Sequence, residues 1–261
     1  MTGPLTGRIA VVTGGASGIG EACCRVLAAR GARVVVADVD EKGARNVAAA
    51  IDGVPLALDV GSAESCEAAA ARCEAEVGAV DVLVTSAGVI QRPLRPEALS
   101  LEDVDRVVAI DQRGTYLSCV AFGRRMANRG RGAIVTIASI AGMRSMPLHA
   151  YAPAKAAVIS MTECLAAEWG GSGVRVNCVS PGYTLTPALQ AAIEKGERDV
   201  STLAANSALG RLVKPDEIAR AVAFLASDEA SAISGVNLPV DAGWLVAPSW
   251  HTYGGLPPRH S

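Results

Sequence analysis

The chain of 261 residues is 50% hydrophobic and 19% charged, which supplies one sizeable apolar core and excludes a disordered chain. A formal net charge of −2, with no basic block, excludes an electrostatic footprint for nucleic acid, so we expect a small-molecule partner. The longest apolar stretch, around Gly132 to Met143, is shorter than the roughly 18 residues that a membrane-spanning helix needs, and residues 1–7 have no signal-peptide character. We therefore expect a cytoplasmic protein without membrane contact.

Cysteine usage favours the same compartment. The seven cysteines are an odd number, form no C-x-x-C pair and lie in apolar segments, such as Cys23-Cys24 and Cys178. Cysteines of this kind are usually small buried hydrophobic residues in a reducing compartment. A structural zinc site would need clustered Cys and His residues, so we expect no metal and no disulfide.

Short apolar runs rich in β-branched residues recur along the chain with helix-length segments between them. Near-continuous apolar strands indicate burial on both faces, and helix-length connections indicate parallel crossovers. We expect an α/β fold of the Rossmann type: one domain, residues 1–245, with a doubly wound, parallel, seven-stranded sheet and helices on both faces. The predicted strands are Ile9–Val12, Val34–Val36, Leu56–Leu58, Val82–Val84, Ile134–Ile137, Val174–Val176 and Val236–Leu238.

Helices are predicted between these strands by periodicity and by the glycines that follow them, as for Ile19–Arg30, Glu41–Ile51 and Ala63–Val77. A proline and two carboxylates begin another at Pro215, which we expect to end near Ala226. The remaining tail, residues 246–261, has prolines, glycines and large aromatic residues but no period. It is either a frayed end or an arm that packs on a neighbouring subunit, and we favour the arm.

A glycine-rich turn, residues 13–20, follows the first predicted strand and runs directly into a helix. Gly14 permits the tight turn, Gly18 lets backbone approach a pyrophosphate, and Gly20 allows close packing of helix on strand. The helix N-terminus would present free N–H groups and a positive dipole to the phosphates. In this strand–turn–helix context the motif predicts a dinucleotide site, although a glycine turn alone is weak evidence.

The second strand ends at Asp38, about 20 residues beyond the glycines, where a carboxylate can accept both hydroxyls of an adenosine ribose. A carboxylate there would also repel the 2′-phosphate of NADP. An NADP site would favour arginine or lysine nearby, yet Ser17 stands in the turn and Val39 follows the carboxylate. The pattern therefore predicts NAD. Asp59-Val60, after the third strand, is a candidate for the adenine edge.

Tyr151 and Lys155 lie four residues apart at the start of an alanine-rich segment, and residues four apart on a helix share a face. A free phenol titrates too high to act as a base at neutral pH, but a neighbouring ammonium stabilises the phenolate. Pro153 fits the first turn of a helix, which places the helix start at the tyrosine. Ser139 follows the fifth strand, where its hydroxyl could hold the substrate oxygen or simply cap backbone. These residues predict a proton-transfer site.

Together, the segment from Thr13 to Gly20, Ser139, the Tyr151/Lys155 pair and the run from Asn177 to Gly182 resemble the short-chain dehydrogenase/reductase family over the chain up to Trp244. The resemblance implies that Pro181-Gly182 closes over the nicotinamide, that Thr184 or Thr186 contacts its carboxamide or the phosphates, and that Lys155 also binds the ribose. It further implies a homodimer or homotetramer. The implied cofactor set is Gly14, Ser17, Gly18, Ile19, Gly20, Asp38, Asp59, Val60, Ser86, Ala87, Gly88, Tyr151, Lys155, Pro181, Gly182, Thr184 and Thr186.

The sequence departs from the family pattern at two positions. Ser86-Ala87-Gly88 stands where the family usually has Asn-Ala-Gly, which keeps the small turn but changes the side chain near the cofactor ribose. Asp111 stands where the family usually has an asparagine whose backbone completes a proton wire to the lysine. That backbone role survives the change, but an added carboxylate would tend to hold the lysine charged and to alter the pH optimum.

Candidate substrate contacts are Ser139, Gln91, His149 and Tyr183, and none of them selects one substrate. The predicted pocket has no cationic cluster for a carboxylate or phosphate. The run from Ser180 to Thr184 and the segment from Leu165 to Trp169 are similar to those of family members that oxidise sugar alcohols and other secondary polyols. The resemblance therefore implies a secondary alcohol such as a polyol or sugar alcohol and its ketone. Two alternatives remain. A 3-oxoacyl-type carbonyl reductase would be expected to use NADPH, against the indication from Asp38, and a non-catalytic NAD-binding regulator would not need the complete catalytic set.

Overall fold

A single parallel sheet organises the protein, for which the computed structural model describes residues 3–196 and 199–256. In these residues the sheet has seven strands in the order β3-β2-β1-β4-β5-β6-β7, and every neighbouring pair is parallel. The expected doubly wound topology is therefore confirmed. The strands are β1 Ile9–Thr13, β2 Arg33–Asp38, β3 Val54–Ala57, β4 Val82–Thr85, β5 Gly132–Ile137, β6 Val174–Pro181 and β7 Asn237–Val240.

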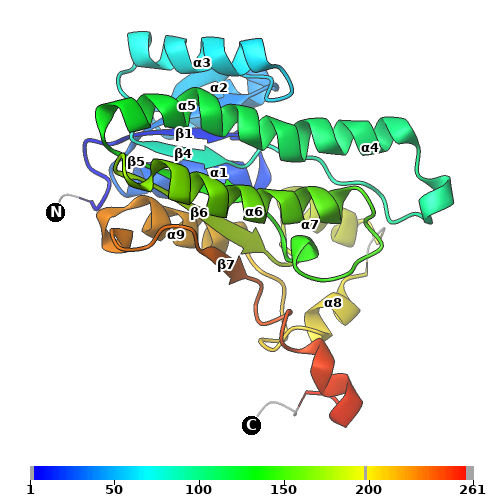
Figure 1. The fold of residues 1–261 in the computed structure, drawn as a ribbon. Helices are drawn as coiled ribbons and strands as arrows, with labels where there is room; N and C mark the ends of the chain where they lie inside the picture. Colours follow the sequence, from blue (N-terminus) through cyan, green and yellow to red (C-terminus); the bar gives the residue numbers. More distant parts are fainter. Residues whose placement is uncertain (1–2, 197–198, 257–261) are drawn as a thin grey trace.

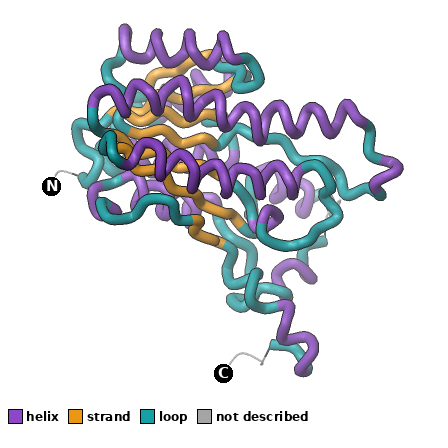
Figure 2. The backbone as a smooth tube through the Cα atoms, in the orientation of Figure 1, coloured by secondary structure: helices purple, strands orange, loops and turns teal. Residues whose placement is uncertain are grey.

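Helices cover both faces of this sheet, and the tube in Figure 2 shows the strands between two helical layers. One core joins the sheet to α1 Gly18–Ala29, α2 Glu41–Ala50 and α9 Pro215–Ala226. The opposite core joins it to α3 Ala63–Glu76, α5 Thr115–Arg129 and α6 Tyr151–Gly170, which lie in front of the sheet in Figure 1. Beyond the layers are α4 Leu101–Val107, α7 Pro187–Glu194 and α8 Ser201–Ala205.

The inner strands are apolar throughout because both of their faces are buried. In β1, Val11 packs into the core under α3 and α5, whereas Val12 packs into the core under α1 and α9. The two edge strands, β3 and β7, are not buried on both faces as expected from the sequence. In β3 only Leu56 is fully buried, and β7 is partly exposed along its whole length, because each has a neighbour on one side alone.

Residues 101–129, in the segment between β4 and β5, form one helical column with a wider turn in its middle. α4 continues into η2, a π-helical stretch over Val108–Gly114, which continues into α5. The π-helical stretch places Asp111 in the interior, where it is fully buried. Stretches of this kind are rare and often occur at functional sites.

The last described segment, expected to lack regular structure, forms η5, a 3₁₀ helix over Pro248–Tyr253. It lies beside α8 and projects away from the sheet (Figure 1), and His251 Nε2 lies 2.9 Å from the side-chain oxygen of Asn206. Trp250 and Tyr253 are 50% and 87% exposed, so large apolar area on this segment is uncovered in the single chain. Residues 257–261 of the expected arm lie outside the described residues.

Within residues 3–196 and 199–256, no helix combines the length and the apolar character needed to cross a bilayer. All seven cysteines are free thiols, and each except Cys164 is buried. Burial raises the pKa of the Cys23 thiol to about 12, as expected for a cysteine that serves as a small core residue.

Candidate active site

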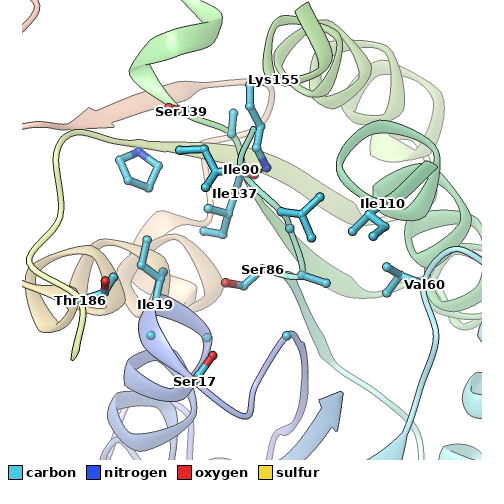
Figure 3. Close-up of a pocket in the computed structure, with 18 of the residues that line it drawn as sticks. Ser17, Ile19, Val60, Ser86, Ile90, Ile110, Ile137, Ser139, Lys155 and Thr186 are labelled. Atoms are coloured by element: carbon cyan, nitrogen blue, oxygen red, sulfur yellow. Dashed lines mark hydrogen bonds between the residues drawn. The ribbon is translucent and has the colours of Figure 1, made fainter. Parts of the chain in front are cut away.

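The candidate site lies at the carboxyl ends of the strands, at the crevice between β1 and β4 where the strand order reverses. Open α/β sheets bind their ligands at this position. A cavity of about 560 Å³ opens there. Eighteen of the predicted residues line it: Gly14, Ser17, Gly18, Ile19, Gly20, Asp38, Asp59, Val60, Ser86, Ala87, Gly88, Ser139, Tyr151, Lys155, Pro181, Gly182, Thr184 and Thr186. Figure 3 shows Ser17 and Ile19 at one end of the cavity and Lys155 at the other.

Three glycines of the turn after β1 have a geometric reason to be glycine. Gly14 has φ +67°, and a Cβ on it would lie 2.6 Å from the backbone of Ala87, so the loops after β1 and β4 touch. A Cβ on Gly20 would lie 2.0 Å from the carbonyl oxygen of Gly14, which would force α1 away from β1. Gly18 has φ +57° and open space toward Thr186. The turn is therefore compact on the protein side and open on the cavity side.

The N-terminus of α1 is built to receive an anion. In the described chain the Ser17 side chain makes no capping hydrogen bond there, whereas Asp40, Ser62 and Ser100 cap α2, α3 and α4. The N–H groups of the first turn of α1 have no carbonyl partners within the helix and face the cavity with the positive end of the helix dipole. These features fit the pyrophosphate of a dinucleotide.

Asp38 stands at the end of β2 with both carboxylate oxygens oriented by backbone. Oδ2 accepts from the N–H of Ala16 at 3.0 Å, and Oδ1 accepts from the N–H of Asp40 at 2.9 Å. The carboxylate thus holds the glycine turn and lines the cavity at the same time. Because each oxygen can accept a second hydrogen bond, this fixed carboxylate also fits ribose hydroxyls.

Tyr151 and Lys155 occupy the first turn and a half of α6, as the spacing predicts. The Lys155 Nζ lies over the ring of Tyr151, 5.4 Å from the ring centroid. It also donates a hydrogen bond to the carbonyl oxygen of Ile137 at 3.2 Å. Lys155 is only 4% exposed. Among the described residues that line the cavity it is the one cation, and the same lining includes the carboxylates of Asp38 and Asp59.

Ser139 follows β5 and caps η3, the 3₁₀ turn Ile140–Gly142. Its Oγ accepts from the N–H of Ala141 at 3.1 Å. Because the hydroxyl acts as an acceptor in that bond, its hydrogen remains available for a substrate oxygen. The capping role and the proposed substrate contact are therefore compatible in one side chain.

Asp111 is fully buried beneath the cavity rather than in its lining. Its Oδ1 accepts from the N–H of Val89 at 2.8 Å and lies 4.0 Å from Lys155 Nζ, while Oδ2 has no hydrogen-bond partner in the described chain. Burial raises the pKa of the Asp111 carboxyl, against the lowering effect of Lys155 and of the Val89 N–H. The family resemblance implies that the backbone at this position completes a proton wire to the lysine. The Asp111 carbonyl oxygen accepts a hydrogen bond from the Thr115 hydroxyl at 2.8 Å.

Three expected substrate contacts lie outside this cavity lining. The Gln91 side chain lies at the N-terminus of α6, where its oxygen already accepts from backbone. His149 is exposed and lines a separate cavity of about 400 Å³ between the segment after β5 and α6. Tyr183 packs edge-to-face on Trp244, with ring centroids 5.5 Å apart.

Several lining residues were not in the predicted set: Val39, Leu58, Val89, Ile110, Ile137 and Ala138. Most of them end a strand or directly follow one. Their position after predicted strands could have identified them from the sequence, because parallel strands direct their carboxyl ends to one edge of the sheet. Ile110 comes from the π-helical stretch and had no comparable signal. Together these residues make much of the cavity wall apolar.

This fold and site fit a dinucleotide-dependent oxidoreductase of the Rossmann type. A family model described as enoyl-(acyl carrier protein) reductase matches residues 14–245. The chain is 44% identical to D-threitol dehydrogenase of Mycolicibacterium smegmatis, over 93% of this chain and 94% of that protein. It is also 44% identical to cis-4-hydroxycyclohexanecarboxylate dehydrogenase of Sinomonas cyclohexanicum, over 91% and 96%.

A crystal structure from Brucella melitensis 16M, named as ribose-5-phosphate isomerase, superposes with a TM-score of 0.95 at 56% identity, covering 99% of this chain and all of that chain. The family model and the dehydrogenase relatives together decide the class. The chain belongs to the short-chain dehydrogenase/reductase family and is an oxidoreductase that acts on alcohols.

Proposed function

We propose that this enzyme interconverts a secondary alcohol of an uncharged polyol and the corresponding ketone, with NAD as its cofactor and Tyr151 as its general acid/base. One observation carries the proposal: the Tyr151/Lys155 pair and the glycine turn with Asp38 line the same cavity. The residues that would hold a dinucleotide and a side chain that can exchange a proton therefore share one cavity.

When bound, the dinucleotide supplies the hydride acceptor for alcohol oxidation or the hydride donor for ketone reduction. Tyr151 takes the hydroxyl proton of the alcohol, or returns it to the ketone oxygen. The Lys155 ammonium, 5.4 Å from the ring centroid, stabilises the phenolate that this exchange requires. Ser139 donates to the substrate oxygen as negative charge develops there.

The preference for NAD follows from charge at the ribose end of the cavity. The Asp38 carboxylate is fixed by two backbone N–H groups, and a 2′-phosphate beside it would add a like charge. Val39, the next residue, is 75% exposed and offers no cation to such a phosphate. Both features favour the unphosphorylated ribose.

The choice of an uncharged polyol rests on the cavity wall and on one relative. Lys155, the single cation in the described lining, is committed to Tyr151 and to the carbonyl oxygen of Ile137, so a substrate phosphate or carboxylate has no arginine or lysine to bind. D-threitol, named in one of the relatives, is an uncharged polyol with secondary hydroxyls. The same absence of free cations disfavours a sugar-phosphate isomerase, the activity for which the Brucella structure is named.

A substrate screen tests the proposal. Purified enzyme is mixed with NAD or NADP and a panel of tetritols, hexitols, cyclic secondary alcohols and 3-hydroxyacyl thioesters, and reduced cofactor is followed by absorbance. We expect oxidation of one or more polyols with NAD. A clear preference for acyl thioesters with NADP would instead indicate a 3-oxoacyl-type reductase. NAD binding without turnover on any alcohol would indicate a regulator, and isomerisation of ribose 5-phosphate without cofactor would indicate the isomerase.

We also propose a cytoplasmic homodimer or homotetramer. The alanine-rich α6 carries small side chains that allow a partner helix to approach closely, and Tyr116 on the neighbouring α5 is 48% exposed. The exposed aromatic residues of η5 suit an arm that packs on a neighbouring subunit. Sedimentation of the purified enzyme at micromolar concentration distinguishes these assemblies from an active monomer.

A further inference from the structure

The N-terminus of α6, which carries Tyr151, is capped by a side chain from another part of the chain. Its N-cap residue, Ala150, has no side-chain acceptor. Instead Gln91 Oε1 accepts from the N–H of Ala150 at 2.6 Å and from the N–H of Tyr151 at 3.0 Å. Gln91 is 3% exposed, and its Nε2 donates to the carbonyl oxygen of Arg92 at 3.4 Å, which fixes the end of the amide that faces the helix.

The other backbone donors at this helix start already have partners or do not exist. The N–H of Ala152 donates to the carbonyl oxygen of Leu148 at 2.8 Å, and that of Ala154 donates to Ala150 at 3.1 Å. Pro153 has no N–H. Gln91 therefore supplies the acceptor for the donors that remain. Without it, two N–H groups would lose their partner at the residue that carries the catalytic phenol.

Gln91 differs from the other side-chain caps in where it comes from. The caps of α2, α3 and α4 are provided by their own N-cap residues. Gln91 instead precedes its helix by 60 residues and follows β4, in the segment whose residues 86–90 line the cavity. Within that segment the N–H of Val89 donates to Asp111, which lies 4.0 Å from Lys155 Nζ. The short segment 89–91 therefore contacts both the backbone of Tyr151, through Gln91, and the carboxyl group of Asp111 near Lys155, through Val89.

We propose that Gln91 is a positioning residue for Tyr151: its amide oxygen holds the tyrosine backbone where the phenol works with Lys155 and Ser139, and its neutrality keeps a negative charge away from the phenolate. This inference rests on the proposed role of Tyr151 as acid/base. Gln91 is therefore placed behind the catalytic tyrosine rather than in contact with substrate.

Two variants separate the acceptor from the charge. Gln91→Met has similar volume but no strong acceptor, and we expect kcat to fall about 10-fold or more while NADH affinity stays within about two-fold. Gln91→Glu keeps the acceptor and adds a carboxylate, so we expect kcat on its alkaline plateau to recover to within about three-fold of wild type.

In Gln91→Glu the limb where oxidation rises with pH should move about 0.5 unit or more upward, because negative charge beside Tyr151 disfavours the phenolate. The charged and titratable groups near this position include the adjacent Arg92, Lys155 on α6, Asp111 on η2 and His149 before α6, and they are unchanged in both variants. Ionisation of Tyr151 is also followed without substrate, by near-ultraviolet absorbance, as the difference between each protein and the same protein carrying Tyr151→Phe.

Ser100→Ala is the matched control, because Ser100 caps α4 by accepting from the N–H of Asp103 at 3.1 Å and is exposed outside the cavity. It should lower Tm without changing kcat or the pH profile. If Gln91→Met lowers Tm in the same way but keeps wild-type kcat and Tyr151 ionisation, the cap is purely structural and the proposal is wrong. If Gln91→Met does not fold, an unshifted phenolate titration in Gln91→Glu overturns it. The absorbance titration decides these outcomes even if the substrate screen finds no alcohol.

Discussion

Replacing Asp111 by asparagine removes a buried charge beside Lys155 and leaves the local structure nearly unchanged. The asparagine oxygen can accept from the Val89 N–H as Oδ1 does now at 2.8 Å. The other carboxylate oxygen, Oδ2, has no hydrogen-bond partner in the described residues, so no contact there requires a carboxylate. The substitution therefore changes mainly the electrostatics around the Tyr151/Lys155 pair.

The size of the effect follows from the 4.0 Å between Asp111 Oδ1 and Lys155 Nζ. At that separation two unit charges attract by about 4 kcal/mol at an effective dielectric constant of 20. Desolvation offsets most of this attraction, and burial indeed raises the pKa of the Asp111 carboxyl despite the nearby ammonium. A net change of about 1.4 kcal/mol corresponds to one pH unit. Without the carboxylate, the ammonium acts undiminished on Tyr151 and favours its phenolate.

We therefore expect the limb where alcohol oxidation rises with pH to lie about one unit lower in Asp111→Asn than in wild type. The assay is the pH profile of kcat/KM for the polyol identified in the screen. Asp81→Asn is the matched control, because Asp81 is also buried, accepts from the N–H of Ile9 at 3.0 Å and lies 3.2 Å from Arg131, but stands just before β4 at the opposite end of the sheet. A folded Asp111→Asn enzyme with the wild-type profile would refute this reasoning.

Three further predictions concern proton transfer, cofactor choice and acid stability. Tyr151→Phe should lower kcat by about 10²-fold or more and leave NADH affinity within a few-fold by fluorescence titration; turnover above a tenth of wild type would assign the proton to another residue. Wild type should prefer NAD to NADP by at least about tenfold in kcat/KM, about 1.4 kcal/mol, and Asp38→Ala should abolish most of that preference; equal wild-type kinetics would exclude the role of Asp38. Arg211 and the backbone N–H of Lys214 lower the pKa of Glu217 to about 2, so this carboxylate stabilises the fold at neutral pH, and that contribution is lost as pH falls from about 5 to about 2. Glu217→Gln should lower Tm by about 2 °C at neutral pH but not near pH 2 by circular dichroism, and an equal loss at both would contradict the assignment.

Much of the fold follows from short-range patterns in the sequence. The predicted ends of α1, α2 and α3 lie within one residue of those in the structure, because apolar periodicity and terminal glycines act locally. The glycine turn and the Tyr151/Lys155 pair are recognisable for the same reason, since each needs only neighbouring residues on one strand–turn–helix unit or one helical face.

Contacts between distant segments could not be obtained in this way. That β1 lies beside β4, so that Gly14 packs against Ala87, depends on how the whole sheet is ordered. From the sequence we expect Gln91 to contact substrate, but the direction of its side chain depends on where α6 begins in space. His149 is close to Tyr151 in sequence and yet lines another cavity.

The sequence by itself predicts which residues carry the chemistry of this oxidoreductase: a glycine turn for phosphate, a carboxylate for ribose and a tyrosine–lysine pair, each encoded by local spacing. Only the tertiary structure decided what surrounds them. The π-helical stretch that buries Asp111 beside Lys155 and the amide of Gln91 behind Tyr151 both join segments tens of residues apart. Their energies come from desolvation and from hydrogen bonds that exist only when those segments are packed together, so no pattern along the chain records them.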